Sequence, residues 1–191
     1  TLVNLLGYEK SLAFANSFYI QNGSEPWSGI YIYSGGALPE VGDSVIVVGE
    51  VSEFCWNDGV LCDGPGTTEI YQPDDIYIIS NNNPIPEPIL VNSGDALQEQ
   101  YEGVLVKMNN VECISNANGY GVWDANDGSG ICGIHNTPDG YEHNEEIGEV
   151  YNITGIVSST FNDWKVDLRI PSPNLPNKNP SPRSSNPFWV F

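Results

Sequence analysis

The sequence predicts an all-β protein of two tandem five-stranded Greek-key barrels followed by an extended C-terminal tail. One observation is the pattern of the 191 residues: short runs of Val, Ile, Tyr and Phe alternate with clusters of Gly, Asn, Asp and Pro, and a helical period is almost absent. The other is an internal repeat, in which residues 41–52 align with 147–158 and residues 18–32 align with 120–134. A repeat of this length indicates two copies of one small β unit.

Each unit is expected to contain five strands. In the first unit they cover residues 2–8, 17–21, 29–33, 44–54 and 69–79. In the second unit they cover residues 103–113, 120–124, 130–135, 150–158 and 165–170. Gly49 and Gly155 fall within strands, where a barrel must bend or bulge. Residues 95–101 are the one helical candidate.

The chain divides into four predicted segments. The first unit covers residues 1–83, a Pro-rich linker with a short helix covers 84–100, and the second unit covers 101–171. Residues 172–191 form a tail rich in Pro, Ser and Asn, which cannot build a core of its own and ends in an aromatic strand.

The charge balance, the apolar runs and the motifs of the sequence argue against three kinds of function. The 25 acidic and 6 basic residues give a net charge of −19, which argues against nucleic acid as a partner because phosphates are bound by Lys and Arg. No apolar run is long enough to span a membrane. No nucleophile-elbow or metal-hydrolase motif is present, so the chain is not expected to be an enzyme.

The four cysteines form two local pairs, which predicts the disulfides Cys55–Cys62 and Cys113–Cys132 and a secreted, extracellular protein. These pairings rest on spacing alone, since four cysteines allow three connectivities. Zinc is the alternative, although no C-x-x-C spacing occurs and the two histidines lack ligand-like spacing. Asn22 and Asn152 begin N-glycosylation sequons.

One loop is a candidate metal site. Asp124, Asn126 and Asp127 lie in an Asp- and Gly-rich stretch with some character of a calcium loop. The same residues are what a tight hairpin turn requires, and a turn alone is the favoured interpretation. No cofactor is required by the sequence, and calcium is the one that this loop leaves open.

Three signatures carry a resemblance to a known family. They are Phe18-Tyr-Ile-Gln, Val41-Gly-Asp-x-Val-x-Val-x-Gly-x-Val-Ser and Tyr101-Glu-Gly-Val-Leu-Val, and the hairpin of residues 123–131 adds to them. Residues 1–171 resemble the tandem OB-fold modules that precede the catalytic domain of secreted bacterial nucleases of the endonuclease/exonuclease/phosphatase class. The resemblance implies two OB-like barrels. No segment here matches the catalytic domain, so it implies no nuclease activity.

OB folds that bind single strands use exposed aromatic residues flanked by cations. The stacking candidates are Tyr19, Trp27, Tyr31, Tyr33 and Trp123, and a face of this kind also suits a glycan. The six basic residues are scattered, so core packing is the favoured interpretation of the aromatic residues.

The end of the tail predicts an assembly contact. Phe188, Trp189, Val190 and Phe191 follow a polar linker and would be a solubility liability in water. Such a segment can add a strand to the sheet edge of a neighbouring copy, here the opening strand of the first unit at residues 1–8. Folding back onto its own chain, or beginning a further domain, are the alternatives.

The sequence therefore predicts a non-catalytic extracellular structural protein, a subunit of a filament or surface assembly joined to copies of itself head to tail. One alternative is an OB module detached from a secreted nuclease that binds single-stranded nucleic acid or a glycan. A second alternative is a calcium-dependent adhesin or matrix protein.

Overall fold

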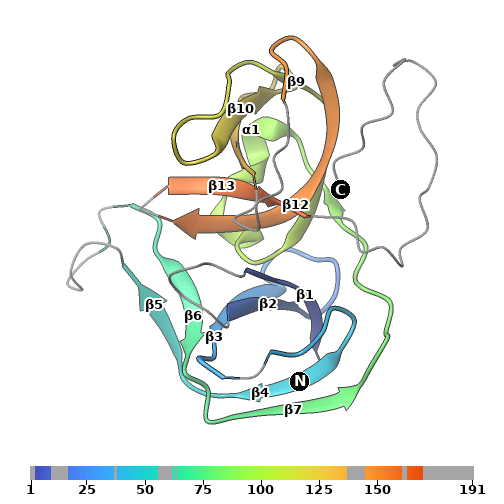
Figure 1. The fold of residues 1–191 in the computed structure, drawn as a ribbon, viewed down its shortest axis with the longest axis vertical. Helices are drawn as coiled ribbons and strands as arrows, with labels where there is room; N and C mark the ends of the chain where they lie inside the picture. Colours follow the sequence, from blue (N-terminus) through green and yellow to red (C-terminus); the bar gives the residue numbers. More distant parts are fainter. Residues whose placement is uncertain are drawn as a thin grey trace.

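The computed structural model describes residues 3–9, 17–36, 38–55, 62, 64–136, 145–160 and 163–169, and these residues form an almost wholly β structure of two stacked units (Figure 1). The first unit contains strands β1 to β7, and the second contains β9 to β13. The all-β prediction is confirmed.

The second unit is a closed five-stranded barrel. Its strands are β9 (Leu105–Cys113), β10 (Val122–Asn126), β11 (Ile131–His135), β12 (Val150–Thr160) and β13 (Asp163–Leu168). The strands lie in the order β10-β11-β13-β12-β9, and β9 pairs again with β10, which closes the barrel. The β11–β13 pair is parallel, and the other pairs are antiparallel. The predicted barrel of the second unit is confirmed, and each predicted strand is found within two residues or so of its expected position.

Alternation along the strands builds the barrel core. In β10, Trp123 and Ala125 are buried and their neighbours are partly exposed, as expected for a strand with one face inward. The same alternation in the other strands completes the interior with Val106, Met108, Val111, Cys113, Cys132, Ile134, Ile153, Val157, Val166 and Leu168. Gly155 allows β12 to bend there, because a side chain at this position would overlap the backbone of Asp167.

The first unit is a seven-stranded sheet in the order β5-β6-β3-β2-β1-β4-β7. Its strands are β1 (Val3–Glu9), β2 (Ser17–Gln21), β3 (Gly29–Tyr33), β4 (Ser44–Val48), β5 (Val51–Phe54), β6 (Thr67–Tyr71) and β7 (Asp75–Ser80). β3 and β6 are parallel, like β11 and β13 in the barrel. Phe18, Ile20, Ile32, Val45 and Ile70 form its core.

Two strands of the first unit were predicted as continuous, and each is divided. The predicted strand 44–54 is β4 and β5, separated at Gly49 and Glu50, where a side chain on Gly49 would overlap Ile70. The predicted strand 69–79 is β6 and β7, separated around Pro73, which has no N–H to donate to a ladder. The two halves of each strand pair with different neighbours, so the sheet is not closed by continuous pairing.

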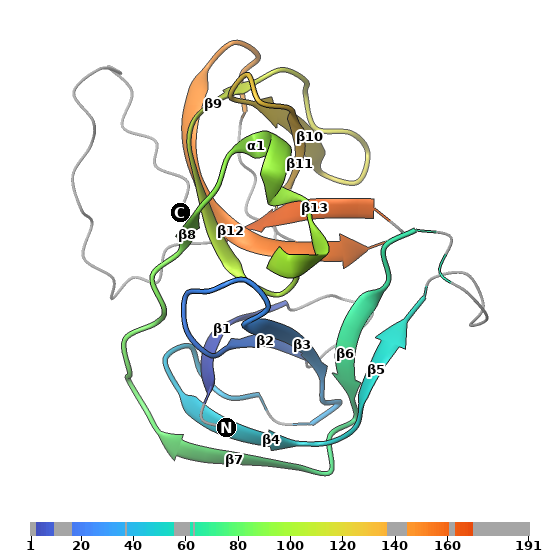
Figure 2. The same cartoon turned by 180° about the vertical axis from the view of Figure 1, so that it is seen from behind.

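The linker runs along the side of both units, from β7 up to the barrel (Figure 2). It forms the short strand β8 (Ile89–Leu90), which pairs in parallel with β9, then α1 (Ser93–Ala96) and the 3₁₀ turn η1 (Glu99–Tyr101). The helix predicted over 95–101 is thus two separate turns. Within the part of the chain that the structure describes, no helix is long and apolar enough to cross a membrane.

The cysteines follow the prediction in one pair only. Cys55 and Cys62 form a disulfide, whereas Cys113 and Cys132 are buried free thiols, so the second predicted disulfide is wrong. Cys113 on β9 and Cys132 on β11 both face Ala125 of the intervening strand β10. Two strand spacings of about 4.8 Å each separate them, which exceeds the distance of about 7 Å that a disulfide can bridge. Burial raises the pKa of Cys132 to about 12, so the thiol stays protonated.

Candidate functional site

The two units meet at a buried seam, with the outer face of β9 and β12 against one face of the first sheet (Figures 1 and 2). Tyr19 of β2 packs with Leu105 of β9 and Ile156 of β12, and Tyr31 of β3 lies beside them. The two tyrosine rings have centroids 5.0 Å apart. This apolar contact joins residues from both copies of the repeat, so the units form one packed body at this point.

Hydrogen bonds and a close backbone approach bring the two units together. Gln21 Oε1 accepts the amide of Leu105 at 2.8 Å, and the amide of Trp27 donates to the carbonyl of Gln100 at 2.7 Å. Gly29 lies directly against Gly103, and a side chain on Gly29 would overlap the Gly103 carbonyl group. Only glycine permits this approach.

A polar cluster occupies one side of the seam. Glu102, just after η1, accepts the amide of Thr68 at 3.1 Å and the hydroxyl of Ser159 at 3.3 Å. The Ser159 hydroxyl, which has one hydrogen to donate, also lies in hydrogen-bond contact with the carbonyl of Gly66 and 2.8 Å from the Thr67 hydroxyl. The cluster thus ties β6 of the first unit to β12 of the second.

Burial raises the pKa of Glu102 to about 7, with the charge of Glu53 adding to the effect, although the hydrogen bonds from Thr68 and Ser159 act in the opposite direction. Burial also raises the pKa of Glu69, the residue next to Thr68. Two carboxyl groups on this seam therefore favour the protonated form more than an exposed glutamate does.

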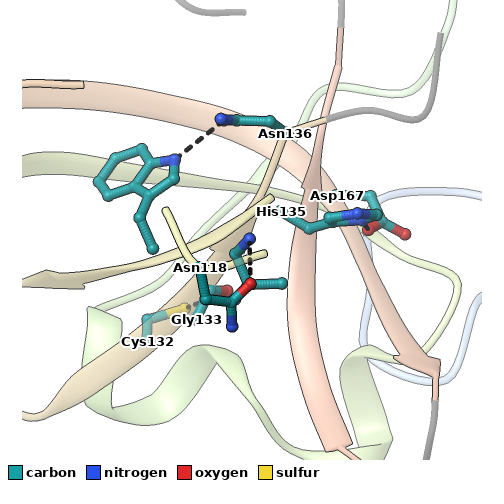
Figure 3. Close-up of polar contacts among 8 residues, drawn as sticks. Asn118, Cys132, Gly133, His135, Asn136 and Asp167 are labelled. Carbon is teal, nitrogen blue, oxygen red and sulfur yellow. Dashed lines mark hydrogen bonds and ion pairs between the residues drawn. The ribbon is translucent and has the colours of Figure 1, made fainter. Parts of the chain in front are cut away.

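A second polar pair lies on the outer face of the barrel. His135 Nδ1 and Asp167 Oδ1 are 2.7 Å apart across the parallel strands β11 and β13, and Figure 3 shows the two side chains facing each other. Asp167 Oδ2 and the hydroxyl of Ser158 are buried without a hydrogen-bond partner. Ser158 lies on β12, beyond β13 from His135, so it cannot act as a nucleophile paired with this histidine.

An exposed strand edge lies at the far end of the first sheet. β7 pairs with β4 and ends the strand order, so among the described residues no strand pairs with its other side. Tyr77, Ile78 and Ile79 are each about half exposed, at 50%, 52% and 50%. Three consecutive apolar side chains on an open edge are a template for strand pairing.

The structure separates the five aromatic stacking candidates. Trp123 is in the barrel core, with its indole donating to Asn136 (Figure 3), and Tyr19 is buried in the seam. Tyr31 is half-buried beside Tyr19, and Tyr33 is half-buried in a stack with Tyr71, with centroids 5.2 Å apart. Trp27 alone of the five is mostly exposed, at 70%. The five do not form one continuous stacking face.

The three calcium candidates each accept hydrogen bonds from protein groups, some in their own turn and some in other segments. Asp127 accepts four hydrogen bonds, from the amide and hydroxyl of Ser93 and of Ser129 at 2.5–3.1 Å. Asn126 accepts the amide of Gly128, and Asp124 accepts the hydroxyl of Ser115. Within the described ranges no group of three or more His, Cys, Asp or Glu residues could hold a metal ion. The calcium site stays a prediction; the observed contacts hold the turn against α1 and against Ser115.

Replacement of Asp127 by alanine is expected to lower the free energy of unfolding by about 1–3 kcal/mol, because the carboxylate fixes α1 against the β10–β11 hairpin through charge-assisted hydrogen bonds. Partial burial acts to raise the pKa of Asp127, but the hydrogen bonds outweigh it and hold this pKa well below its ordinary value. The stabilisation is therefore present above pH of about 4 and lost as the pH falls further.

Urea unfolding at pH 7 and pH 3 measures both effects. Asp127→Asn keeps the acceptor Oδ1 and should lose less than the alanine variant. Calcium that raised the melting temperature of the native chain but not of Asp127→Asn would instead establish the metal site.

The remaining predicted positions are divided between exposed, partly buried and undescribed residues. Asn22 is exposed in a loop, whereas Asn152 is half-buried in β12 and accepts the amide of Asn110 at 3.0 Å. Phe188, Trp189, Val190 and Phe191 lie outside the described residues. Sequence reasoning missed Glu102 and β7 as sites. Nothing local distinguishes Glu102 from the other acidic residues, whereas the Ile78-Ile79 pair after Pro73 was an available signal for β7.

No protein family and no curated protein sequence matches the chain. Among solved structures, the fold of the chain is weakly similar to the structure of a murine DNA-binding protein bound to double-stranded DNA. The sequence identity is 11% and the TM-score is 0.38. The similarity covers 88% of this chain and 93% of the other. A likeness this weak supports no conclusion about the fold or the function.

Proposed function

We propose that this protein is a non-catalytic, extracellular structural subunit that associates with copies of itself by strand addition at β7. The single observation that carries the proposal is the open edge of β7 with its three half-exposed apolar side chains. A disulfide between Cys55 and Cys62 is compatible with an oxidising, extracellular location.

The segment that fits this edge is the C-terminal tail of a neighbouring copy. Residues 188–191 supply four apolar side chains for strand pairing. Charge favours the contact as well. Residues 172–191 contain Lys178 and Arg183 and no acidic residue, whereas all 25 acidic residues and four of the six basic ones lie in residues 1–171. A cationic tail is attracted to an acidic body, which otherwise repels its own copies.

The acceptor differs from the one expected at residues 1–8. β1 lies inside the sheet, paired with β2 along most of its length and with β4 at Val3 and Asn4. Among the described residues no strand lies beside β7 on one side along its whole length, so it offers the longer edge for pairing.

The proposal also includes the type of fold that the two units share. The first unit repeats the pairing order of the barrel if β4 and β5 are counted as one interrupted strand, and we infer two tandem OB-like units. In such units the face of the second and third strands binds nucleic acid. Here the corresponding face of β2 and β3 carries Tyr19 and Tyr31 at the seam, which disfavours a nucleic-acid role for it.

The test is size exclusion with light scattering of three proteins at physiological salt: the full chain, a chain ending at Pro176, and the variant Tyr77→Lys/Ile79→Lys. We expect the full chain to form oligomers and the other two to be monomers, since charged residues block strand pairing at an edge.

The matched control is Tyr120→Lys/Ile131→Lys, which adds the same charge at side chains 80% and 59% exposed on the other unit. It should assemble like the full chain. Oligomers that survive the β7 variant would exclude β7 as the acceptor, and a monomeric full chain at all concentrations would contradict the proposed function.

A further inference from the structure

Glu102 links the two units through its carboxyl group. Its side chain is 7% exposed, and its two oxygens bond to opposite units, Oε2 to the amide of Thr68 and Oε1 to the hydroxyl of Ser159. Thr67 and Gly66 continue the contact from the first unit to the same serine. A change in the charge of this carboxyl group therefore changes the hydrogen bonds that join the two units.

The surroundings of Glu102 are acidic. Glu53 of β5 accepts the hydroxyl of Thr68 at 3.0 Å, so Glu53 and Glu102 share one threonine. The charged groups on the elements packed around Glu102 are Glu53 on β5, Glu69 on β6, Glu99 on η1, and Asp163, Lys165 and Asp167 on β13, the strand beside β12. Among the residues that the structure describes, none forms an ion pair with Glu102.

We propose that Glu102 is a proton-operated latch between the two units: in its protonated form it joins β6 to β12, and in its ionised form it places a buried negative charge beside Glu53 and loosens the contact between the units. The protonated carboxyl can both accept from the Thr68 amide and donate to the Ser159 hydroxyl, which leaves no charge without a counterion. The ionised form must remain buried without an ion pair, which is unfavourable.

The direction of the pH dependence follows from the pKa of Glu102, which is about 7 in the folded protein against 4.5 for an ordinary glutamate. The folded state holds the Glu102 proton where the unfolded state has lost it, so the stability that Glu102 contributes is greatest below pH 4.5 and is lost as the pH rises through about 7. A shift of this size corresponds to a fall in the folded-to-unfolded ratio of up to about two orders of magnitude. Glu69, whose pKa is also raised, adds a smaller fall of the same sign.

The experiment compares the full chain with Glu102→Gln by urea unfolding between pH 5 and pH 9. Glutamine is isosteric with the protonated carboxyl and cannot ionise. We expect the stability of the native chain to fall from pH 5 to pH 7.5. In Glu102→Gln most of this pH-dependent decrease in stability should be absent. At pH 8 the folded-to-unfolded ratio of the variant should therefore exceed that of the native chain at least tenfold. The control Glu99→Gln removes the same charge from an exposed side chain three residues away and should follow the native chain.

Hydrogen exchange locates the effect. Protection factors of the Trp27 and Leu105 amides, which donate across the seam, should fall with rising pH in the native chain more than those of amides between β10 and β11. An identical pH slope for Glu102→Gln and the native chain, or an equal loss at all amides, would overturn the latch.

A direct titration of the native chain needs no variant. The carboxyl carbon of Glu102 in an NMR titration should have its midpoint near pH 7, and the amide of Thr68 should shift with the same midpoint. A midpoint near pH 4.5 would reject the proposal even if Glu102→Gln fails to fold.

Discussion

Replacement of Trp123 by alanine is expected to lower the free energy of unfolding by about 3–5 kcal/mol, the usual cost of truncating a buried aromatic residue. Trp123 is 1% exposed in the barrel core, and its ring lies edge-on to Tyr151 with centroids 5.8 Å apart. Its indole N–H donates to Asn136 Oδ1 at 3.0 Å. Alanine removes this packing and hydrogen bond and leaves a cavity. Urea unfolding followed by circular dichroism measures the loss.

Two matched variants show whether burial is the cause. Trp27→Ala removes the same side chain from a position 70% exposed and should change stability by less than about 0.5 kcal/mol. Trp123→Phe keeps most of the ring but loses the bond to Asn136, so its effect should fall between the two. Equal effects of the two tryptophan-to-alanine changes would contradict the placement of Trp123 in the core.

Replacement of Gly29 by alanine is expected to destabilise the protein by about 1–3 kcal/mol and to act at the seam. The new methyl group would overlap the backbone of Gly103, which cannot move aside as a flexible side chain can. The first and second units would have to separate locally, which breaks the amide contacts of Trp27 and Leu105. Urea unfolding measures the total effect, and hydrogen exchange of these two amides measures the local one.

The control for this change is Gly119→Ala. Gly119 has open space around the position of a Cβ atom and no positive φ, so alanine there should be neutral or slightly stabilising. A Gly29→Ala variant as stable as Gly119→Ala, with unchanged exchange at Leu105, would show that the units do not pack as closely as the structure has them.

The contact between the two units and the open edge of β7 lie on different parts of the molecule. Contacts from β2, β3 and β6 to β9 and β12 combine the two repeats into a single body, and β7 lies at the other side of the first sheet. The proposed assembly contact and the proposed latch therefore lie on different surfaces. Each can be tested without disturbing the other, because β7 lies on the side of the first unit away from the barrel (Figure 1).

The sequence by itself determined the strands and the barrel of the second unit, because alternation of apolar residues and turn-forming glycines are local signals. Residues 17–21 and 29–33 were predicted at their observed bounds. It also determined the Cys55–Cys62 disulfide, whose two cysteines are seven residues apart and close a short loop.

Only the tertiary structure decided which strands lie beside one another and which polar groups are buried. It placed β10 between Cys113 and Cys132, and it left one side of β7 without a neighbouring strand among the described residues. It also enclosed Glu102 between residues 34 and 57 positions away in the chain. Pairing and burial depend on such distant contacts, so no local pattern around these residues contains them.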